Sequence, residues 1–472
     1  MIYAPFSYNL IFHYNKEKNL MATSTKDLAK VLTRGNLMSM AVGQIIGAGV
    51  MVMSISALGM TGRSVNIAFV IAAIFTVFAA IPVVFYSSVV RLRGGMYSQA
   101  ALFVGETFSG FYTITYLISN CSMAMYAIGF TSYLLSLIPA LQGKDVIVAA
   151  LVFTAFYILN LFGTEKIAKV QDMMFYVLVV ALLMFTAFGL PRVHWSGYFA
   201  TPGFDGTPLF NNGITGLLQA ASFLTFATGG ATIIVNFSAE AINPQKDIPF
   251  VIVVSTLSVA LLYALLATCI GGILPADEVM AAGNLSVIAK AIMPAWAYYI
   301  FVIGGACFAL GTTLNASLGW VTKPLLQSIE DGWLPAGLGK LNKYGIPYIL
   351  LTIFYVINVA AILFGLDVDQ LGQLVLIIGN VQNVILTYGI MKLPKMFPEQ
   401  WAKSPFHVSD GVFKGCLWAG IAVILVQFYM NVSGTTMTIV IINAVTMVVA
   451  GVFAVTMKKS GKVHMEVSYE LA

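Results

Sequence analysis

The chain has 472 residues, of which 59% are hydrophobic and only 9% are charged. A soluble domain carries about 25% charged residues, and the mean hydropathy of this chain is +0.89. These values exclude a soluble globular protein and predict an all-α integral membrane protein with many spans. A membrane β-barrel is also excluded, because polar residues do not occupy every second position of the apolar segments.

The net charge of +5 is modest and is explained by membrane topology, so we expect no nucleic-acid partner. The four cysteines lie far apart within apolar segments and the four histidines lie outside them, which is not the spacing of a disulfide framework or a metal site. Near the membrane plane the sequence offers neither a nucleophile with its base nor paired carboxylates. We therefore expect no enzyme, no catalytic residue, no metal and no cofactor.

The N-terminal segment, residues 1–35, precedes the first apolar stretch and is expected on the cytoplasmic side. Residues 1–20 are rich in aromatic side chains and lack the apolar region and cleavage site of a signal peptide. Two interpretations stay open for them. They form a disordered extension, or they precede a physiological start at Met21.

The first apolar stretch, residues 36–58, is long enough to cross a bilayer as a helix. Its centre contains Gly43, Gly47 and Gly49, and each glycine costs a helix about 1 kcal/mol relative to alanine. A span that unwinds at mid-depth exposes backbone N–H and C=O groups to a bound solute. We interpret the stretch as a broken helix that lines a substrate site, with close packing between continuous helices as the alternative.

Eleven further spans follow the first. The twelve predicted spans are residues 36–58, 64–90, 107–138, 145–162, 170–190, 214–238, 249–273, 295–326, 347–366, 369–391, 413–431 and 435–457. Basic residues favour the cytoplasmic side of a membrane protein. With the N-terminus inside, all but four of the 24 basic residues are cytoplasmic, the exceptions being Arg63, Lys144, Arg192 and Lys290. This asymmetry predicts a multi-pass protein of the cell membrane with both termini cytoplasmic.

The sixth span carries a second interruption, Gly229-Gly230, followed by Ala231 and Thr232. Interruptions at corresponding positions of two halves indicate a transporter site near the midplane. Since five helices is an odd number, a second five-helix repeat must be inverted relative to the first. The predicted organisation is a ten-helix core at 36–391 with repeats 36–190 and 214–391, a loop and two accessory helices at 392–457, and a cytoplasmic tail at 458–472.

Four motifs, in order along the chain, resemble those of the amino acid–polyamine–organocation (APC) permeases. They are GQIIGAGVMVM in the first span, Arg91–Tyr97 between spans two and three, FATGGAT at 226–232 with residues 243–249 after it, and Glu330–Pro335 after the eighth span. The resemblance covers residues 36–335. It implies a LeuT-like fold of five plus five helices, with helices 1 and 6 broken, that moves amino acids or related amines by alternating access.

The resemblance also implies where a substrate binds. The backbone-binding positions that it carries over are Ile45, Ala48, Gly49, Phe226, Ala227 and Gly229. Freed amides at the N-terminus of a half-helix suit a carboxylate, and freed carbonyls at the C-terminus of another suit an ammonium. Phe226 is either an aromatic lid over the substrate or an ordinary packing residue.

Two amide side chains are further candidates. The resemblance places Asn120 at a substrate-facing position of the third span, and Asn315 lies in the eighth span. An amide in hydrocarbon costs free energy unless it finds a partner. An interhelical hydrogen bond is therefore the alternative role for each of them.

Charged residues are missing near the middle of every predicted span, so we expect a neutral substrate side chain. Leu178 stands where proton-coupled relatives can carry a lysine, and both exchange and proton-coupled symport stay open. An amine or polyamine transporter or antiporter is the alternative function. The expected partners are a small-molecule substrate, the lipid bilayer and, under symport, protons; the chain is expected to be a monomer or a homodimer.

Overall fold

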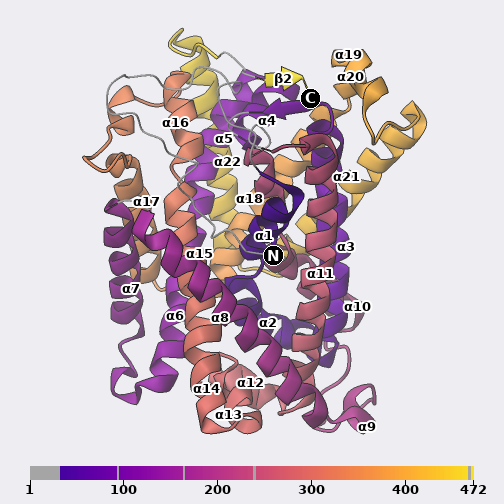
Figure 1. Cartoon of the computed structure of the whole chain (residues 1–472), viewed down its shortest axis with the longest axis vertical. Coiled ribbons are helices and arrows are strands. Elements are labelled where there is room, and N and C mark those ends of the chain that lie inside the picture. Colours follow the sequence, from indigo (N-terminus) through magenta and orange to yellow (C-terminus); the bar gives the residue numbers. More distant parts are fainter. Residues whose placement is uncertain (1–31, 93–94, 163–164, 238–240, 466–468, 472) are drawn as a thin grey trace, which may run out of the picture.

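The computed structural model describes residues 32–92, 95–162, 165–237, 241–465 and 469–471. Within these ranges the chain forms one bundle of helices, most of which run between two opposite ends of the molecule (Figure 1). Residues 1–20, for which two interpretations were open, lie outside the described residues.

Helices occupy all five spans predicted between residues 36 and 190. Their bounds are α1 (Arg34–Ile45), α2 (Ala48–Thr61), α3 (Val65–Ser87), α4 (Gly95–Phe103), α5 (Glu106–Ser119), α6 (Ala124–Leu137), α7 (Asp145–Leu161), α8 (Glu165–Gly189) and α9 (Trp195–Tyr198). Short 3₁₀ helices are η3 (Gly62–Ser64), η4 (Asn120–Met123), η5 (Pro139–Leu141) and η6 (Leu190–Arg192).

The second half of the chain is helical as well, and it covers the remaining predicted spans. Its elements are α10 (Gly213–Thr228), η7 (Ala231–Phe237), α11 (Pro244–Gly272), α12 (Ala276–Ala282), α13 (Ser286–Ile292), α14 (Ala295–Tyr299), the π-helical η8 (Ile300–Cys307), α15 (Phe308–Trp320), α16 (Lys323–Glu330), η9 (Ala336–Gly339), α17 (Tyr348–Leu363) and α18 (Val368–Ile390). After these come α19 (Leu393–Met396), α20 (Pro398–Lys403), α21 (Asp410–Ser433) and α22 (Met437–Lys459).

Two short strands depart from the all-α expectation. Strand β1 (Val90–Leu92) follows α3, and β2 (Tyr469–Leu471) lies near the end of the chain. They pair antiparallel, with Leu92 opposite Tyr469 and Val90 opposite Leu471. The pairing places the C-terminal segment beside the connection between α3 and α4 (Figure 1).

Residues that are expected on the same side of the membrane lie at the same end of the bundle. Arg34 at the start of α1 forms an ion pair of 2.7 Å with Asp247 at the start of α11, and both residues are expected to be cytoplasmic. In Figure 1 the elements α4, α16 and β2 lie at one end of the bundle, whereas α9, α12 and α13 lie at the other. The first group is expected inside and the second outside.

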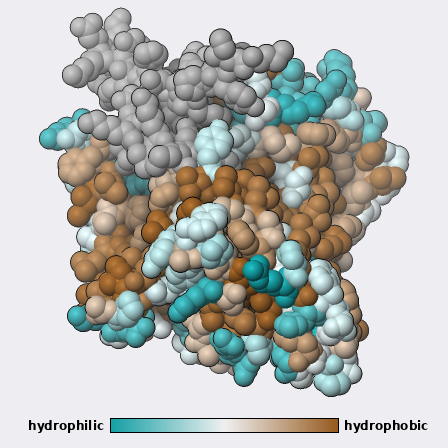
Figure 2. All heavy atoms as spheres, turned by 60° about the horizontal axis from the view of Figure 1, so that its bottom comes forward, coloured by the Kyte–Doolittle hydropathy of each residue, from teal (hydrophilic) through white to brown (hydrophobic). Residues whose placement is uncertain are grey.

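The surface between the two ends is apolar. Figure 2 shows a broad hydrophobic belt, with hydrophilic side chains gathered beyond it. Among the described residues, seven helical stretches are long and apolar enough to cross a membrane: Gly49–Ser87, Gly213–Val235, Pro244–Gly272, Ala295–Glu330, Val368–Ile390, Asp410–Ser433 and Met437–Lys459. Shorter apolar helices are Asp145–Leu161, Tyr176–Arg192 and Tyr348–Leu363. An apolar belt of this kind is the surface that a lipid bilayer requires.

Irregular helix occurs in the third and eighth predicted spans as well as in the first and sixth. In the third span the 3₁₀ turn η4 separates α5 from α6. In the eighth span the π-helical η8 joins α14 to α15. Such irregular turns inside long helices are frequent at functional sites, and these two fall in the third helix of each predicted repeat.

Candidate substrate site

The first span is interrupted after Ile45, where α1 ends, and it resumes at Ala48, where α2 begins. Between them Ile46 is extended, with φ −74° and ψ 90°, and Gly47 has φ −149° and ψ −140°. Gly47 offers no side chain to cap α2, so the first N–H groups of α2 are left for other partners. These groups form the positive end of the α2 dipole.

The sixth span is interrupted after Thr228, where α10 ends, and it continues from Ala231 as the 3₁₀ helix η7. Gly229 is extended, with φ −74° and ψ −176°, and Gly230 has φ +104°. Glycine adopts a positive φ without the steric strain that a Cβ atom would bring, so Gly230 permits this break. The last carbonyl groups of α10 form the negative end of its dipole.

The two interruptions touch each other. A Cβ atom added to Gly49 would lie 2.5 Å from the Cα atom of Ala227. A Cβ atom added to Gly230 would lie 3.2 Å from the carbonyl oxygen of Gln44. The broken segments therefore approach at backbone distance, and small residues are required at the contact. The positive end of α2 and the negative end of α10 meet in one region.

Neighbouring helices hold the first interruption in place. The hydroxyl of Tyr263, on α11, donates a hydrogen bond of 2.9 Å to the carbonyl oxygen of Ile45. A Cβ atom added to Gly47 would overlap the hydroxyl oxygen of Thr313 on α15. Sequence reasoning missed both neighbours, because a tyrosine or a threonine in an apolar span carries no local signal of its partner.

A hydroxyl pair holds the second interruption. Thr228, the last residue of α10, shares a hydrogen bond of 2.7 Å with Thr76 of α3 through their Oγ1 atoms. The same Oγ1 atom donates to the carbonyl oxygen of Leu224, one turn back in α10, at 3.3 Å. The end of α10 is thus fixed to α3 immediately before the chain leaves the helix.

The structure brings the six backbone-binding candidates together around this contact. They are Ile45, Ala48 and Gly49 beside the first break and Phe226, Ala227 and Gly229 beside the second. Ile45 and Ala227 are buried, with 3% and 2% of their surface exposed. Phe226 is partly buried and packs against the hydrophobic core. Substrate binding by these residues stays a prediction.

Asn120 occupies the turn between α5 and η4. Its side-chain Nδ2 donates to the carbonyl oxygen of Tyr116 at 2.8 Å, one turn back. Asn358 of α17, which is fully buried, donates to the backbone oxygen of Asn120 at 3.1 Å and accepts from the N–H of Ala124 at 2.7 Å. Asn358 therefore satisfies the backbone of this irregular turn, and sequence analysis had not singled it out.

Asn315 takes part in an interhelical hydrogen bond. Its Oδ1 accepts from Nδ2 of Asn160, on α7, at 2.9 Å. Two residues earlier, Thr313 meets Gly47. Because successive helical residues are rotated by about 100°, Asn315 and Thr313 lie on nearly opposite faces of α15. The hydrogen bond to Asn160 is the interhelical role that the sequence left open as the alternative.

Ionisable side chains lie toward the two ends of the bundle. Ser56 of α2 donates a hydrogen bond to the carboxylate of Asp369, in the first turn of α18. In the 191–213 connection, burial alone would raise the pKa of Asp205, but hydrogen bonds from Thr207 and the N–H of Ala276 outweigh it and lower that pKa. Across the part of the chain that the structure describes, no three histidine, cysteine or acidic residues cluster as metal ligands would.

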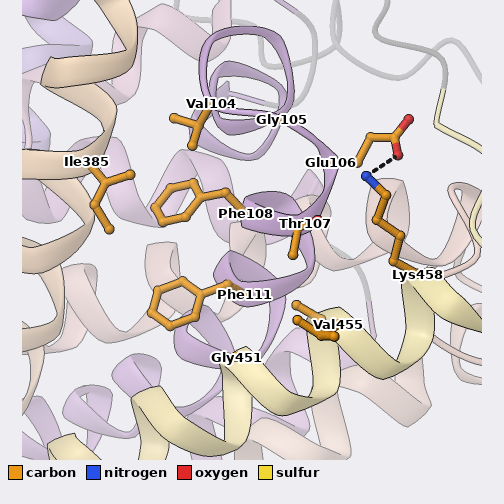
Figure 3. A pocket seen from close by; sticks show the side chains of 11 residues that line it. Val104, Gly105, Glu106, Thr107, Phe108, Phe111, Ile385, Gly451, Val455 and Lys458 are labelled. Carbon is orange, nitrogen blue, oxygen red and sulfur yellow. Dashed lines mark ion pairs between the residues drawn. The ribbon is translucent and has the colours of Figure 1, made fainter.

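A pocket of about 450 Å³ lies away from the interruptions, at the ends of α5, α18 and α22 that are expected to be cytoplasmic (Figure 3). Phe108 and Phe111 of α5 stack in its wall with ring centroids 5.4 Å apart. At its rim Lys458 forms an ion pair of 3.2 Å with Glu106. The pocket is thus a largely apolar hollow with one exposed charge pair, unlike the helix ends at the two breaks.

Interrupted helices whose opposite dipole ends meet are typical of membrane transport proteins. The family model described as "Amino acid permease" matches residues 32–457. The chain belongs to this amino acid permease family. A transporter, rather than an enzyme, follows from this membership.

Curated relatives match most of the chain at low identity. The branched-chain amino acid permease BcaP of Bacillus subtilis (strain 168) is 25% identical over 82% of this chain and 86% of its own length. The vacuolar cationic amino acid transporter 4 of Arabidopsis thaliana is 26% identical over 74% of this chain and 60% of its own length. The methylthioribose transporter of Bacillus subtilis (strain 168) is 25% identical over 86% of this chain and 92% of its own length.

Proposed function

We propose that the protein is a secondary transporter that carries neutral amino acids across the cell membrane by alternating access. The observation that carries the proposal is the contact between Gly49 and Ala227, which joins the positive end of α2 to the negative end of α10. A zwitterion presents a carboxylate to the first and an ammonium to the second. Recognition by backbone groups needs small residues there, and the chain supplies them.

The absence of charged residues near the middle of the predicted spans supports a substrate with a neutral side chain. Lysine, arginine, aspartate and glutamate are absent near the middle of every predicted span. A charged substrate side chain buried at that depth would have no counter-ion and would pay a large desolvation cost. The names of the relatives cover branched-chain and cationic amino acids, so the side-chain class has to be measured.

The proposal includes the architecture predicted from the sequence. Twelve spans in two inverted five-helix repeats, with accessory helices α21 and α22 and cytoplasmic termini, place the two breaks at corresponding positions of the repeats. Further support comes from η4 and η8, the irregular turns in the third helix of each repeat. Single-cysteine accessibility on intact cells and inverted vesicles tests the sidedness of each connection.

The experiment for the substrate class is uptake of labelled amino acids into proteoliposomes. Leucine, alanine, arginine, glutamate and spermidine are compared as substrates and as competitors. The proposal expects transport of the neutral amino acids and weak competition by the other three. Competition by arginine or glutamate equal to that of leucine contradicts the neutral side chain, and transport of spermidine alone supports the amine alternative.

Exchange and proton-coupled symport are distinguished by measuring uptake into vesicles with different contents. Vesicles loaded with unlabelled substrate are compared with empty ones, each with and without a protonophore. Exchange requires internal substrate and ignores the protonophore. With an inward proton gradient imposed on all vesicles, symport proceeds in empty vesicles and collapses when the protonophore is added.

A further inference from the structure

The segment after α22 lies across the end of the bundle that is expected to be cytoplasmic. We call residues 460–465 together with β2 the C-terminal strap. The match to the family model ends at residue 457, so the strap lies beyond the part of the chain that the family shares. It contacts two motifs that the sequence analysis singled out, namely Arg91–Tyr97 and Glu330–Pro335.

The first attachment is at the turn after α16. The N–H of His464 donates to the backbone oxygen of Asp331 at 3.0 Å, and Nε1 of Trp333 donates to the sulfur of Met465 at 3.3 Å. Trp333 is fully buried. Gly332 has φ +83°, and a Cβ atom there would overlap the carbonyl oxygen of Lys462. The turn is therefore shaped for close approach by the strap.

The turn after α16 is also held by hydrogen bonds to the carboxylate of Asp331. Tyr97, on α4, donates a hydrogen bond of 2.6 Å to the carboxylate of Asp331. Gln327 of α16 donates to the other carboxylate oxygen at 3.2 Å. The strap is thus anchored on a rigid turn that also ties α4 to α16.

The second attachment is the pairing of β2 with β1, which directly follows α3. Leu92 lies opposite Tyr469 and Val90 opposite Leu471. Backbone hydrogen bonds of a strand pair fix the position of one segment on the other. The end of α3 and the turn after α16 are thereby joined through the strap.

The strap links two groups of helices that carry different parts of the site. Helix α3 packs against α10 and α11, which hold the second break and Tyr263. Helix α16 follows α15, which carries Thr313, and α16 packs against α5 and α4. An opening at the cytoplasmic end that separates these groups must stretch or release the strap.

We propose that the C-terminal strap is a latch that keeps the cytoplasmic end closed until it detaches from β1. The latch rests on the proposed transport function, because a gate at this end exists only in a transporter. At the root of the strap the inner end of α22 is held to α5 by the half-exposed pair Lys458–Glu106, above the pocket of Figure 3. Exposed ion pairs contribute little stability, so the pair Lys458–Glu106 does not prevent the strap from detaching.

The decisive test is a disulfide across the strand pair. Leu92→Cys and Tyr469→Cys are introduced into a chain whose native cysteines, Cys121, Cys269, Cys307 and Cys416, are replaced by alanine. Directly opposed antiparallel residues have Cα atoms about 4.5–5.5 Å apart, within the range that a disulfide spans. The control pair is Leu92→Cys with Glu470→Cys, two residues that are not opposite each other in the register of the strand pair.

Oxidation is expected to reduce uptake by the opposed pair at least about tenfold, a difference of about 1.4 kcal/mol in the barrier to opening. A reductant restores uptake in the same sample, which excludes misfolding as the cause. The control pair keeps its rate under both conditions. An oxidised opposed pair that transports at its reduced rate overturns the latch.

Truncation supplies a second test that does not need transport. Deleting residues 466–472 removes β2 but keeps the attachment to Trp333, and deleting 461–472 removes both attachments. A single Val42→Cys in α1 reports access from the inner end through labelling by an impermeant maleimide in inverted vesicles. Labelling is expected to become faster with each deletion, and unchanged labelling overturns the latch. Failure of the whole chain to transport amino acids contradicts the proposed function and leaves this labelling test intact.

Discussion

The first and the sixth predicted spans are both interrupted, but different features of the structure keep the two breaks open. At the first break two α-helices end on either side of Ile46 and Gly47, and side chains of other helices occupy the gap, with Tyr263 bonded to Ile45 and Thr313 against Gly47. At the second break Gly230 has a positive φ and the chain leaves as a 3₁₀ helix.

Neighbouring side chains hold both breaks, but only the second break also depends on a positive φ of its own backbone. Removing the hydroxyl of Tyr263 should disturb the first break and leave the second unchanged. A Cβ atom added at either break should disturb that break. At Gly49 the cause is crowding against Ala227, and at Gly230 it is backbone strain. The following predictions use these differences, beginning with the largest expected effect.

Gly49→Ala is expected to abolish most transport. The new Cβ atom would lie 2.5 Å from the backbone of Ala227, and overpacking of this kind costs about 1–3 kcal/mol. The two dipole ends are forced apart, so we expect uptake to fall about 10- to 100-fold, the factor corresponding to about 1.4–2.8 kcal/mol. The measurement is proteoliposome uptake at matched protein content.

Gly415→Ala is the matched control for Gly49→Ala. Gly415 lies on α21, and a Cβ atom there meets nothing within 4 Å. We expect wild-type uptake from this variant. Equal loss in both variants would mean that contact between the breaks is not what transport requires.

Gly230→Ala should lower transport about tenfold. A non-glycine residue in the left-handed region pays about 1–2 kcal/mol, and the new Cβ atom would also press on the carbonyl oxygen of Gln44 at 3.2 Å. Gly143→Ala pays the same kind of strain at φ +79° but has open space around it. Thermal melting should show destabilisation in both variants, whereas an uptake defect is expected in Gly230→Ala alone.

Tyr263→Phe tests the dependence of the first break on its neighbours. It removes the hydrogen bond to Ile45, a loss of about 1 kcal/mol. Tyr198→Phe is the control, because Tyr198 is equally buried and donates to the backbone oxygen of Arg63 at 2.7 Å, near the outer end. Both variants should melt earlier, with reduced substrate affinity expected only for Tyr263→Phe. Equal substrate affinity in the two variants would mean that Tyr263 does not contribute to the substrate site.

The smallest effect is expected at Asp331, which lies far from both breaks. Burial raises the pKa of Asp331 above its ordinary value of 3.8, although hydrogen bonds from Tyr97 and Gln327 act in the opposite direction. The carboxyl of Asp331 then binds more protons in the folded protein than in the unfolded chain, so the contribution of this group to stability is largest below pH 3.8 and is lost as pH rises through the raised pKa. Asp331→Asn should flatten this part of the curve of Tm against pH while leaving substrate affinity unchanged.

The two breaks could be predicted from the sequence because glycine acts locally. Gly47, Gly49, Gly229 and Gly230 weaken a helix wherever it lies, and no knowledge of neighbours is needed. The apolar stretches likewise predicted where helices occur. Residues 32–457 then matched the family, as the four motifs had indicated.

The neighbours of the breaks could not be predicted, because hydrogen bonds between distant helices leave no local pattern. Tyr263 is one of 21 tyrosines, and only the packing of α11 on α1 selects it. Asn120 and Asn315 were noticed as polar residues in apolar spans, but their partners Asn358 and Asn160 depend on tertiary packing. The pairing of β1 with β2 joins Val90–Leu92 to Tyr469–Leu471, far away in the sequence, in a register that neither three-residue segment encodes.

The central claim is that bare backbone groups at the two breaks hold both ends of a zwitterion, and it is tested most directly by thermal shift. A bound ligand raises stability by mass action, so leucine is compared with leucinol, which lacks the carboxylate, and with isocaproate, which lacks the ammonium. The account predicts that leucine raises Tm of the wild type, that neither analogue does, and that leucine fails on Gly49→Ala. An analogue that raises Tm as much as leucine would contradict it.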